Sequence, residues 1–121
     1  MAIFKSFPQI KLVYFFGSKA NGKSGPLSDY DFAFYLNEWN RKKMFEIKFK
    51  LMDELSRLLE TDEVDVVILN LAESPELKYQ IVANGKLIYE KEPFRVLVEP
   101  KILNEYFDFR QFLLRHNLTK A

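Results

Sequence analysis

The chain has 121 residues, of which 48% are hydrophobic, and this is enough for one domain with a packed core. Its formal net charge of +1 gives no overall basic field, so nucleic acid is not expected as a direct partner. The absence of cysteine excludes disulfides and thiolate metal sites, and the single histidine, His116, does not make a zinc site.

No part of the sequence predicts a membrane segment. No apolar run approaches the length of a membrane span, and the N-terminal residues lack the apolar core of a signal peptide. We therefore expect a cytoplasmic protein with no membrane partner.

Two strands and one long helix are predicted in the first half of the chain. After a loop or single turn over residues 1–10, residues 11–16 form a nearly continuous β-branched and aromatic run, which is typical of a buried strand. A turn-rich segment follows, in which residues 19–22 favour one helical turn that ends at its glycine. Residues 30–36 predict the second strand. Between residues 41 and 59 the apolar side chains recur at steps of three and four, which predicts an amphipathic helix.

The second half predicts two more strands and two more helices. Residues 64–69 predict a third strand, and a serine–proline pair opens a helix that ends at about Asn84. Residues 86–89 indicate a short edge strand. After Pro100, residues 101–116 predict a second amphipathic helix. Its aromatic side chains exceed what a small sheet must cover, so a partner-binding surface is an alternative to a core role.

The order of these elements predicts a single α+β domain over residues 1–121, with its core at about residues 11–90 and the C-terminal helix after it. We expect a small mixed β-sheet with helices packed against one face.

Two aspartates open the second predicted strand. Asp29 and Asp31 point to the same face, about 7 Å apart along the strand, because side chains alternate with a period of two. Two like charges held so close repel, so a cation is expected between them. Gly17 and Ser18 lie upstream at the end of the first strand, where backbone N–H groups can hold a phosphate. A phosphate cradle beside paired carboxylates indicates nucleotide chemistry.

Asp65 is the one charged residue inside the third predicted strand. By itself it has an ordinary explanation: it caps a turn, pairs with a lysine or arginine, or lies on the solvated face of an edge strand. Together with Asp29 and Asp31 it favours a different one, in which carboxylates from two strands converge on one or two Mg²⁺ ions. Asp65 would then assist the deprotonation of an attacking hydroxyl.

Gly17-Ser18, a spacer of ten residues, Asp29-x-Asp31 and the later strand residue Asp65 form an ordered set of motifs. The set resembles the DNA polymerase β-like nucleotidyltransferase superfamily. The small size and the sequence from Gly17 to Gly22 are similar to its minimal nucleotidyltransferases, the MNT or MntA-type proteins. The resemblance covers about residues 11–90 and implies the nucleotidyltransferase fold.

The resemblance also implies a reaction: transfer of a nucleoside monophosphate from a nucleoside triphosphate, usually ATP, with release of pyrophosphate. Gly17, Ser18 and Lys19 would bind the triphosphate. The catalytic residues and Mg²⁺ ligands, with two ions expected, would be Asp29, Asp31 and Asp65.

A protein partner is a further implication. Many MNT proteins are the antitoxin of a pair whose toxin is a HEPN-domain RNase, and they are understood to adenylylate a tyrosine of that toxin. We therefore expect a type VII-like antitoxin with a HEPN toxin as acceptor, in a homo- or hetero-oligomer. Two alternatives stay open: an antitoxin that neutralises its toxin by binding alone, and an aminoglycoside-type enzyme that modifies a small molecule.

Overall fold

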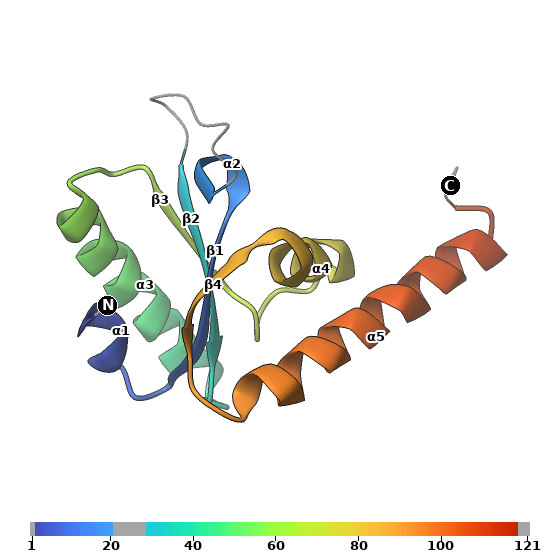
Figure 1. Cartoon of the computed structure of the whole chain (residues 1–121), viewed down its shortest axis with the longest axis horizontal. Helices are drawn as coiled ribbons and strands as arrows, with labels where there is room; N and C mark the ends of the chain where they lie inside the picture. Colours follow the sequence, from blue (N-terminus) through green and yellow to red (C-terminus); the bar gives the residue numbers. More distant parts are fainter. Residues whose placement is uncertain (1, 21–28, 119–121) are drawn as a thin grey trace.

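The computed structural model describes residues 2–20 and 29–118 (Figure 1). Within these ranges the strands are β1, Ile10–Phe16; β2, Tyr30–Leu36; β3, Val64–Ile68; and β4, Lys86–Glu90. They form one sheet in the order β3-β2-β1-β4. β1 pairs antiparallel with both β2 and β4, whereas β2 and β3 are parallel. The predicted mixed sheet is confirmed, and β4 lies at an edge as expected.

The helices of the described ranges are α1, Ala2–Lys5; α2, Gly17–Ala20; α3, Arg41–Leu59; α4, Pro75–Asn84; and α5, Phe94–Arg115. Local signals set the starts of α3 and α4. The Asn40 side chain accepts a hydrogen bond from the Lys43 backbone N–H at 3.1 Å, and the Ser74 hydroxyl accepts one from the Leu77 N–H at 3.2 Å. None of the helices in the described part of the chain is long and apolar enough to cross a membrane.

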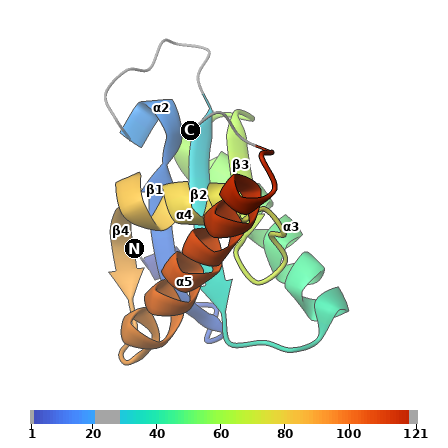
Figure 2. The ribbon, with the colours of Figure 1, turned by 90° about the vertical axis from the view of Figure 1, so that its right-hand side faces the viewer.

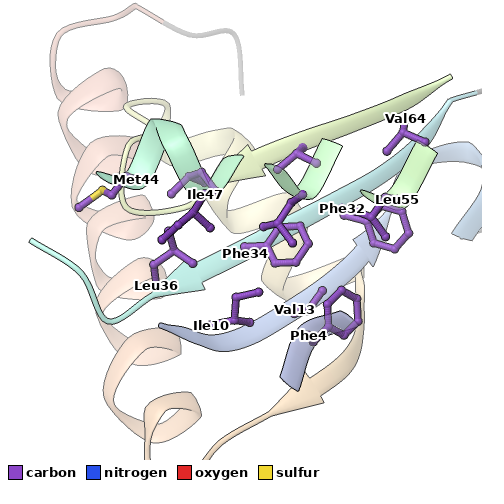
Figure 3. Close-up of a cluster of buried hydrophobic side chains, with 13 residues drawn as sticks. Phe4, Ile10, Val13, Phe32, Phe34, Leu36, Met44, Ile47, Leu55 and Val64 are labelled. Atoms are coloured by element: carbon purple, nitrogen blue, oxygen red, sulfur yellow. The ribbon is translucent and has the colours of Figure 1, made fainter. Parts of the chain in front are cut away.

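One face of the sheet packs against α1 and α3. Its buried cluster, shown in Figure 3, combines strand residues such as Val13 and Phe34 with Phe4 of α1 and Leu51 of α3. The ring centroids of Phe4 and Phe34 lie 5.6 Å apart in an edge-to-face arrangement. This layer holds α3 along the β2 and β3 side of the sheet.

The other face packs against α4 and α5, so the α+β class is confirmed while the helices cover both faces rather than one (Figures 1 and 2). Leu12 and Tyr14 of β1 point to this second layer, where they meet Ile81 of α4 and Ile102 of α5. The reason is visible in the strands themselves: their apolar residues are almost continuous rather than alternating, so both faces must be buried.

α5 begins at Phe94 and passes through Pro100, whereas the sequence predicted a start after the proline. Val98 and Ile102, on either side of the proline, are both buried against the sheet. The Tyr14 hydroxyl donates to the Glu99 carboxylate at 2.5 Å, which ties this turn of α5 to β1. These contacts outweigh the lost backbone hydrogen bond that an internal proline imposes.

Candidate active site

The aspartates singled out in the sequence lie where β2 and β3 begin. Asp31 and Asp65 are register partners in the parallel pair, so their backbones lie side by side. Asp29 precedes Asp31 by two residues. Ala33 and Val67 contact the α4–α5 layer, and Asp31 and Asp65 each lie two residues before one of them, so both belong to that face of the sheet. Asp29 lies just before β2, and its charge acts on Asp31. The structure thus brings together carboxylates from two strands.

The electrostatics of Asp31 also indicate this proximity. Burial raises the pKa of the Asp31 carboxyl group above its ordinary value, and the negative charges of Asp65 and Asp29 raise that pKa further. Among the side chains that the structure describes, no lysine or arginine forms an ion pair with these three carboxylates. Within the described part of the chain, the negative charge of this cluster is therefore not compensated by an ion pair.

Gly17 lies directly against this cluster. Its φ angle is +83°, a conformation that other residues adopt only with strain. A Cβ atom at this position would also overlap the Asp31 carboxylate oxygen Oδ2. The backbone angle therefore favours glycine here, and any larger residue would have to displace the Asp31 carboxylate.

The other predicted nucleotide-binding residues follow Gly17 in α2. The backbone of Ser18 and Lys19 belongs to this short helix, but their side chains lie outside what the structure describes. Gly22, at which the sequence predicted the end of a helical turn, lies outside the described residues. Within the described residues, the helical turn begins earlier than expected, at Gly17.

Glu63 is a fourth acidic residue at the site, and the sequence reasoning missed it. A hydrogen bond with Asp29, followed by the charge of that residue, raises the pKa of the exposed Glu63 carboxyl group. The Tyr30 backbone N–H donates to the Glu63 carbonyl at 2.8 Å, which joins the first residue of β2 to the residue before β3. A signal was present, because Glu63-x-Asp65 repeats the spacing of Asp29-x-Asp31.

The donor set fits a hard divalent cation. Carboxylate oxygens are the ligands that Mg²⁺ prefers, and a cation would relieve the repulsion that raises the Asp31 pKa. In the arrangement described for residues 2–20 and 29–118, no three acidic, histidine or cysteine side chains are yet gathered closely enough to form a metal site.

A cleft of about 390 Å³ opens beside Gly17. Phe16 and Gly17 line it from β1 and α2, and Gln80, Asn84 and Gly85 line it from the end of α4. The Asn84 side-chain amide donates to the Gln80 side-chain carbonyl at 2.5 Å. The cleft therefore joins the carboxylate end of the sheet to a pair of polar amides.

Comparison with known proteins agrees with this geometry. Residues 1–94 match the family described as "Polymerase beta, Nucleotidyltransferase". Because the match spans most of the 121 residues, the chain belongs to that family and is a nucleotidyltransferase. No curated protein matches the sequence significantly.

Solved structures of toxin–antitoxin complexes share the fold. A toxin–antitoxin structure with AMP-PNP has a TM-score of 0.74 at 25% identity, over 95% of this chain and 91% of that one. A mutant of the pair MntA–HpeT has a TM-score of 0.67 at 25% identity, with the same coverage. An MNT antitoxin in complex with a tri-AMPylated HEPN toxin from Shewanella oneidensis has a TM-score of 0.67 at 24% identity, over 95% of this chain and 88% of that one.

Proposed function

We propose that this protein is the antitoxin of a HEPN toxin and that it transfers AMP from ATP to a tyrosine hydroxyl of that toxin. The observation that carries the proposal is the juxtaposition of Asp31 with Asp65 and Gly17 at one end of the sheet. The similarity to a toxin–antitoxin structure with AMP-PNP, an ATP analogue, supports both the nucleotide and the class of partner.

The nucleotide would lie between α2 and the carboxylates. Backbone N–H groups after Gly17, with the Ser18 hydroxyl and the Lys19 ammonium group, would bind the triphosphate. The cleft of about 390 Å³ between Gly17 and Asn84 has room for the nucleoside, and its amides offer donors and acceptors to a base or ribose.

Asp29, Asp31 and Asp65 would hold Mg²⁺, with two ions in the full site. Bound there, Mg²⁺ supplies positive charge that neutralises the triphosphate and increases the acidity of the attacking hydroxyl. The charges of Asp65 and Asp29, which add to burial in raising the pKa of Asp31, support this role, because a cation would relieve their repulsion.

The transfer forms one bond and breaks one. The tyrosine oxygen bonds to the α-phosphorus of ATP, and the bond between that phosphorus and the oxygen that bridges to the β-phosphate breaks. Pyrophosphate leaves with the negative charge, and the Asp65 carboxylate accepts the hydroxyl proton. Asp65 suits this role because its side chain is exposed on an edge strand, whereas Asp31 is half-buried.

Neutralisation by binding alone is the second candidate, because α5 offers an apolar surface. Phe107 and Phe112 are each 52% exposed, and Leu114 is 38% exposed. Such side chains are ordinarily covered by a partner when they cluster on one element. In this candidate the toxin would be silenced by occlusion without nucleotide transfer.

Incubation with ATP labelled at the α-phosphate, Mg²⁺ and the HEPN toxin encoded with this protein separates the two candidates. We expect the label on a toxin tyrosine, together with loss of RNase activity that persists after the two proteins are separated. The Asp65→Asn variant should still bind the toxin and should transfer no label. Inhibition by the wild type without any label on the toxin would overturn the transfer function and leave occlusion.

A further inference from the structure

The outer edge of β3 has no partner strand within the described residues. β3 is the terminal strand of the sheet and lies at its rim beside α3 (Figure 2). The Tyr30 N–H donates to the Glu63 carbonyl, so the residue before β3 directs its backbone toward β2. Successive residues of a strand direct their backbone groups to opposite sides, so Val64 and Val66 direct their N–H and C=O groups to the open edge.

A groove of about 410 Å³ runs along this edge. α3 forms one wall through Arg41, Phe45 and Lys48, and Leu77 at the start of α4 contributes to the other. Asp65 lines the groove as well, at the end where β3 begins. The groove therefore connects an unpaired strand edge with one of the carboxylates of the candidate active site.

The walls of the groove combine positive charge with apolar surface. Neither Arg41 nor Lys48 forms an ion pair with a carboxylate among the side chains that the structure describes. The Arg41 guanidinium instead lies over the Phe45 ring, 5.7 Å from its centroid. Leu77 is 39% exposed on the opposite side. An occupant with acidic and apolar side chains would complement these walls.

We propose that the acceptor polypeptide binds as an added strand along the outer edge of β3, with acidic side chains facing Arg41 and Lys48 and its acceptor hydroxyl at Asp65. Strand addition satisfies the backbone groups of Val64 and Val66, and such pairing binds an extended segment through its main chain. From Asp65 to Ile68 the strand rises about 10 Å, so roughly four extended residues fit alongside.

This inference rests on the proposed function and adds to it the form in which the substrate is presented. An extended segment offers a hydroxyl that can approach the carboxylate cluster from the edge of the sheet, without insertion into the fold. The recognised feature is thus a local stretch of the toxin, with an acidic residue near its tyrosine, rather than the tyrosine alone.

The test compares two double variants of α3 with the wild type. Arg41→Glu/Lys48→Glu reverses the charges that line the groove, and Lys42→Glu/Lys50→Glu makes the same change in charge at exposed positions on the same helix that do not line it. For the groove variant we expect the KM for the toxin to rise about tenfold or more, while the KM for ATP stays unchanged. The control variant should stay within about twofold of the wild type for both substrates.

Hydrogen exchange provides a second readout that needs no substitution. With AMP-PNP, Mg²⁺ and the toxin present, the amides of Val64 and Val66 should become protected. Protection of these amides by this protein alone, rising with its concentration, would instead identify a second copy as the occupant and overturn the proposal.

The possible outcomes separate a failure of the strand-addition site from a failure of the proposed AMP transfer. If the wild type transfers AMP to the toxin while the groove variant does so with an unchanged KM, the strand-addition site is wrong and the proposed function stands. If the wild type labels no protein at all, both fail. An equal loss in the groove and control variants would also overturn the site, because it would reflect the overall charge of α3 only.

Discussion

The two ends of the β2–β3 pair differ in how well their polar groups are satisfied. At the far end, the Asn70 side chain accepts a hydrogen bond from the Leu36 N–H at 2.9 Å and donates one to the Leu36 carbonyl at 2.8 Å. At the near end, Asp31 and Asp65 lie in register with no described cation beside them. One end contributes to stability, and at the other end like charges repel one another, a repulsion that the proposed metal ion would relieve.

The apolar layers make this contrast possible. Val13, Phe34 and Leu51 lie in one layer, and Tyr14 and Ile81 lie in the other, all essentially inaccessible to solvent. Because both faces of the central strands are packed, the register is determined without help from the carboxylate end. The fold therefore tolerates a cluster of like charges at the carboxylate end of the sheet.

Asp31→Asn should produce the largest effect at the carboxylate end. We expect AMP transfer to fall at least about a thousandfold, because the amide is a poorer ligand for the metal ion and removes one charge from the site. Measurement of labelled toxin over time tests this. Asp62→Asn, an exposed neighbour, is the matched control and should leave the rate nearly unchanged. More than a tenth of wild-type activity in Asp31→Asn would contradict the assigned role.

Gly17→Ala should reduce transfer by about a hundredfold, because the new methyl group displaces the Asp31 carboxylate and strains a backbone at positive φ. The rates of the single and double variants form a cycle with Asp31→Asn. In the Asp31→Asn background, Gly17→Ala should cost less activity than in the wild type, because only the strain of the backbone still contributes. Full additivity of the two losses would show that Gly17 acts independently of Asp31.

Asn70→Ala tests the opposite end. Two hydrogen bonds to the Leu36 backbone are lost, so the free energy of unfolding should fall by about 2 kcal/mol. Chemical denaturation measures this change, and the transfer rate per folded molecule should stay the same. Asn104→Ala, on the exposed side of α5, is the control. A loss of activity without a loss of stability would contradict the assignment of Asn70 to stability rather than to transfer.

The pH dependence of stability should show the smallest effect. The folded-state pKa of Asp31 is raised, so its contribution to stability is present at low pH and is lost as the pH rises through that pKa. In metal-free buffer, Asp31→Asn should therefore become more stable relative to the wild type between about pH 4 and pH 7. Urea midpoints at the two pH values measure the difference. A relative gain of the wild type over this range would show that Asp31 is stabilised as a carboxylate instead.

Much of the secondary structure was predictable because its signals are local. The bounds of β2 and α3 follow from periodicity, and the first turns of α3 and α4 follow from their capping residues, Asn40 and Ser74. α5 was predicted with the wrong start, because Pro100 is locally a helix breaker and only the burial of Val98 and Ile102 against the sheet carries the helix through it.

The amino-acid sequence alone determined which residue types stand at the carboxylate end and part of their geometry. The i, i+2 spacing of Asp29 and Asp31 requires a shared face wherever a strand forms, and a Gly-Ser turn before such a pair indicates phosphate binding. Only the tertiary structure decided that Asp65 lies beside Asp31 and that Gly17 contacts that carboxylate. It also decided that Glu63 interacts with Asp29 and that, within the described residues, no strand pairs with the outer edge of β3. These relations depend on strand order and register, which arise from packing between residues far apart in the chain and leave no local pattern to read.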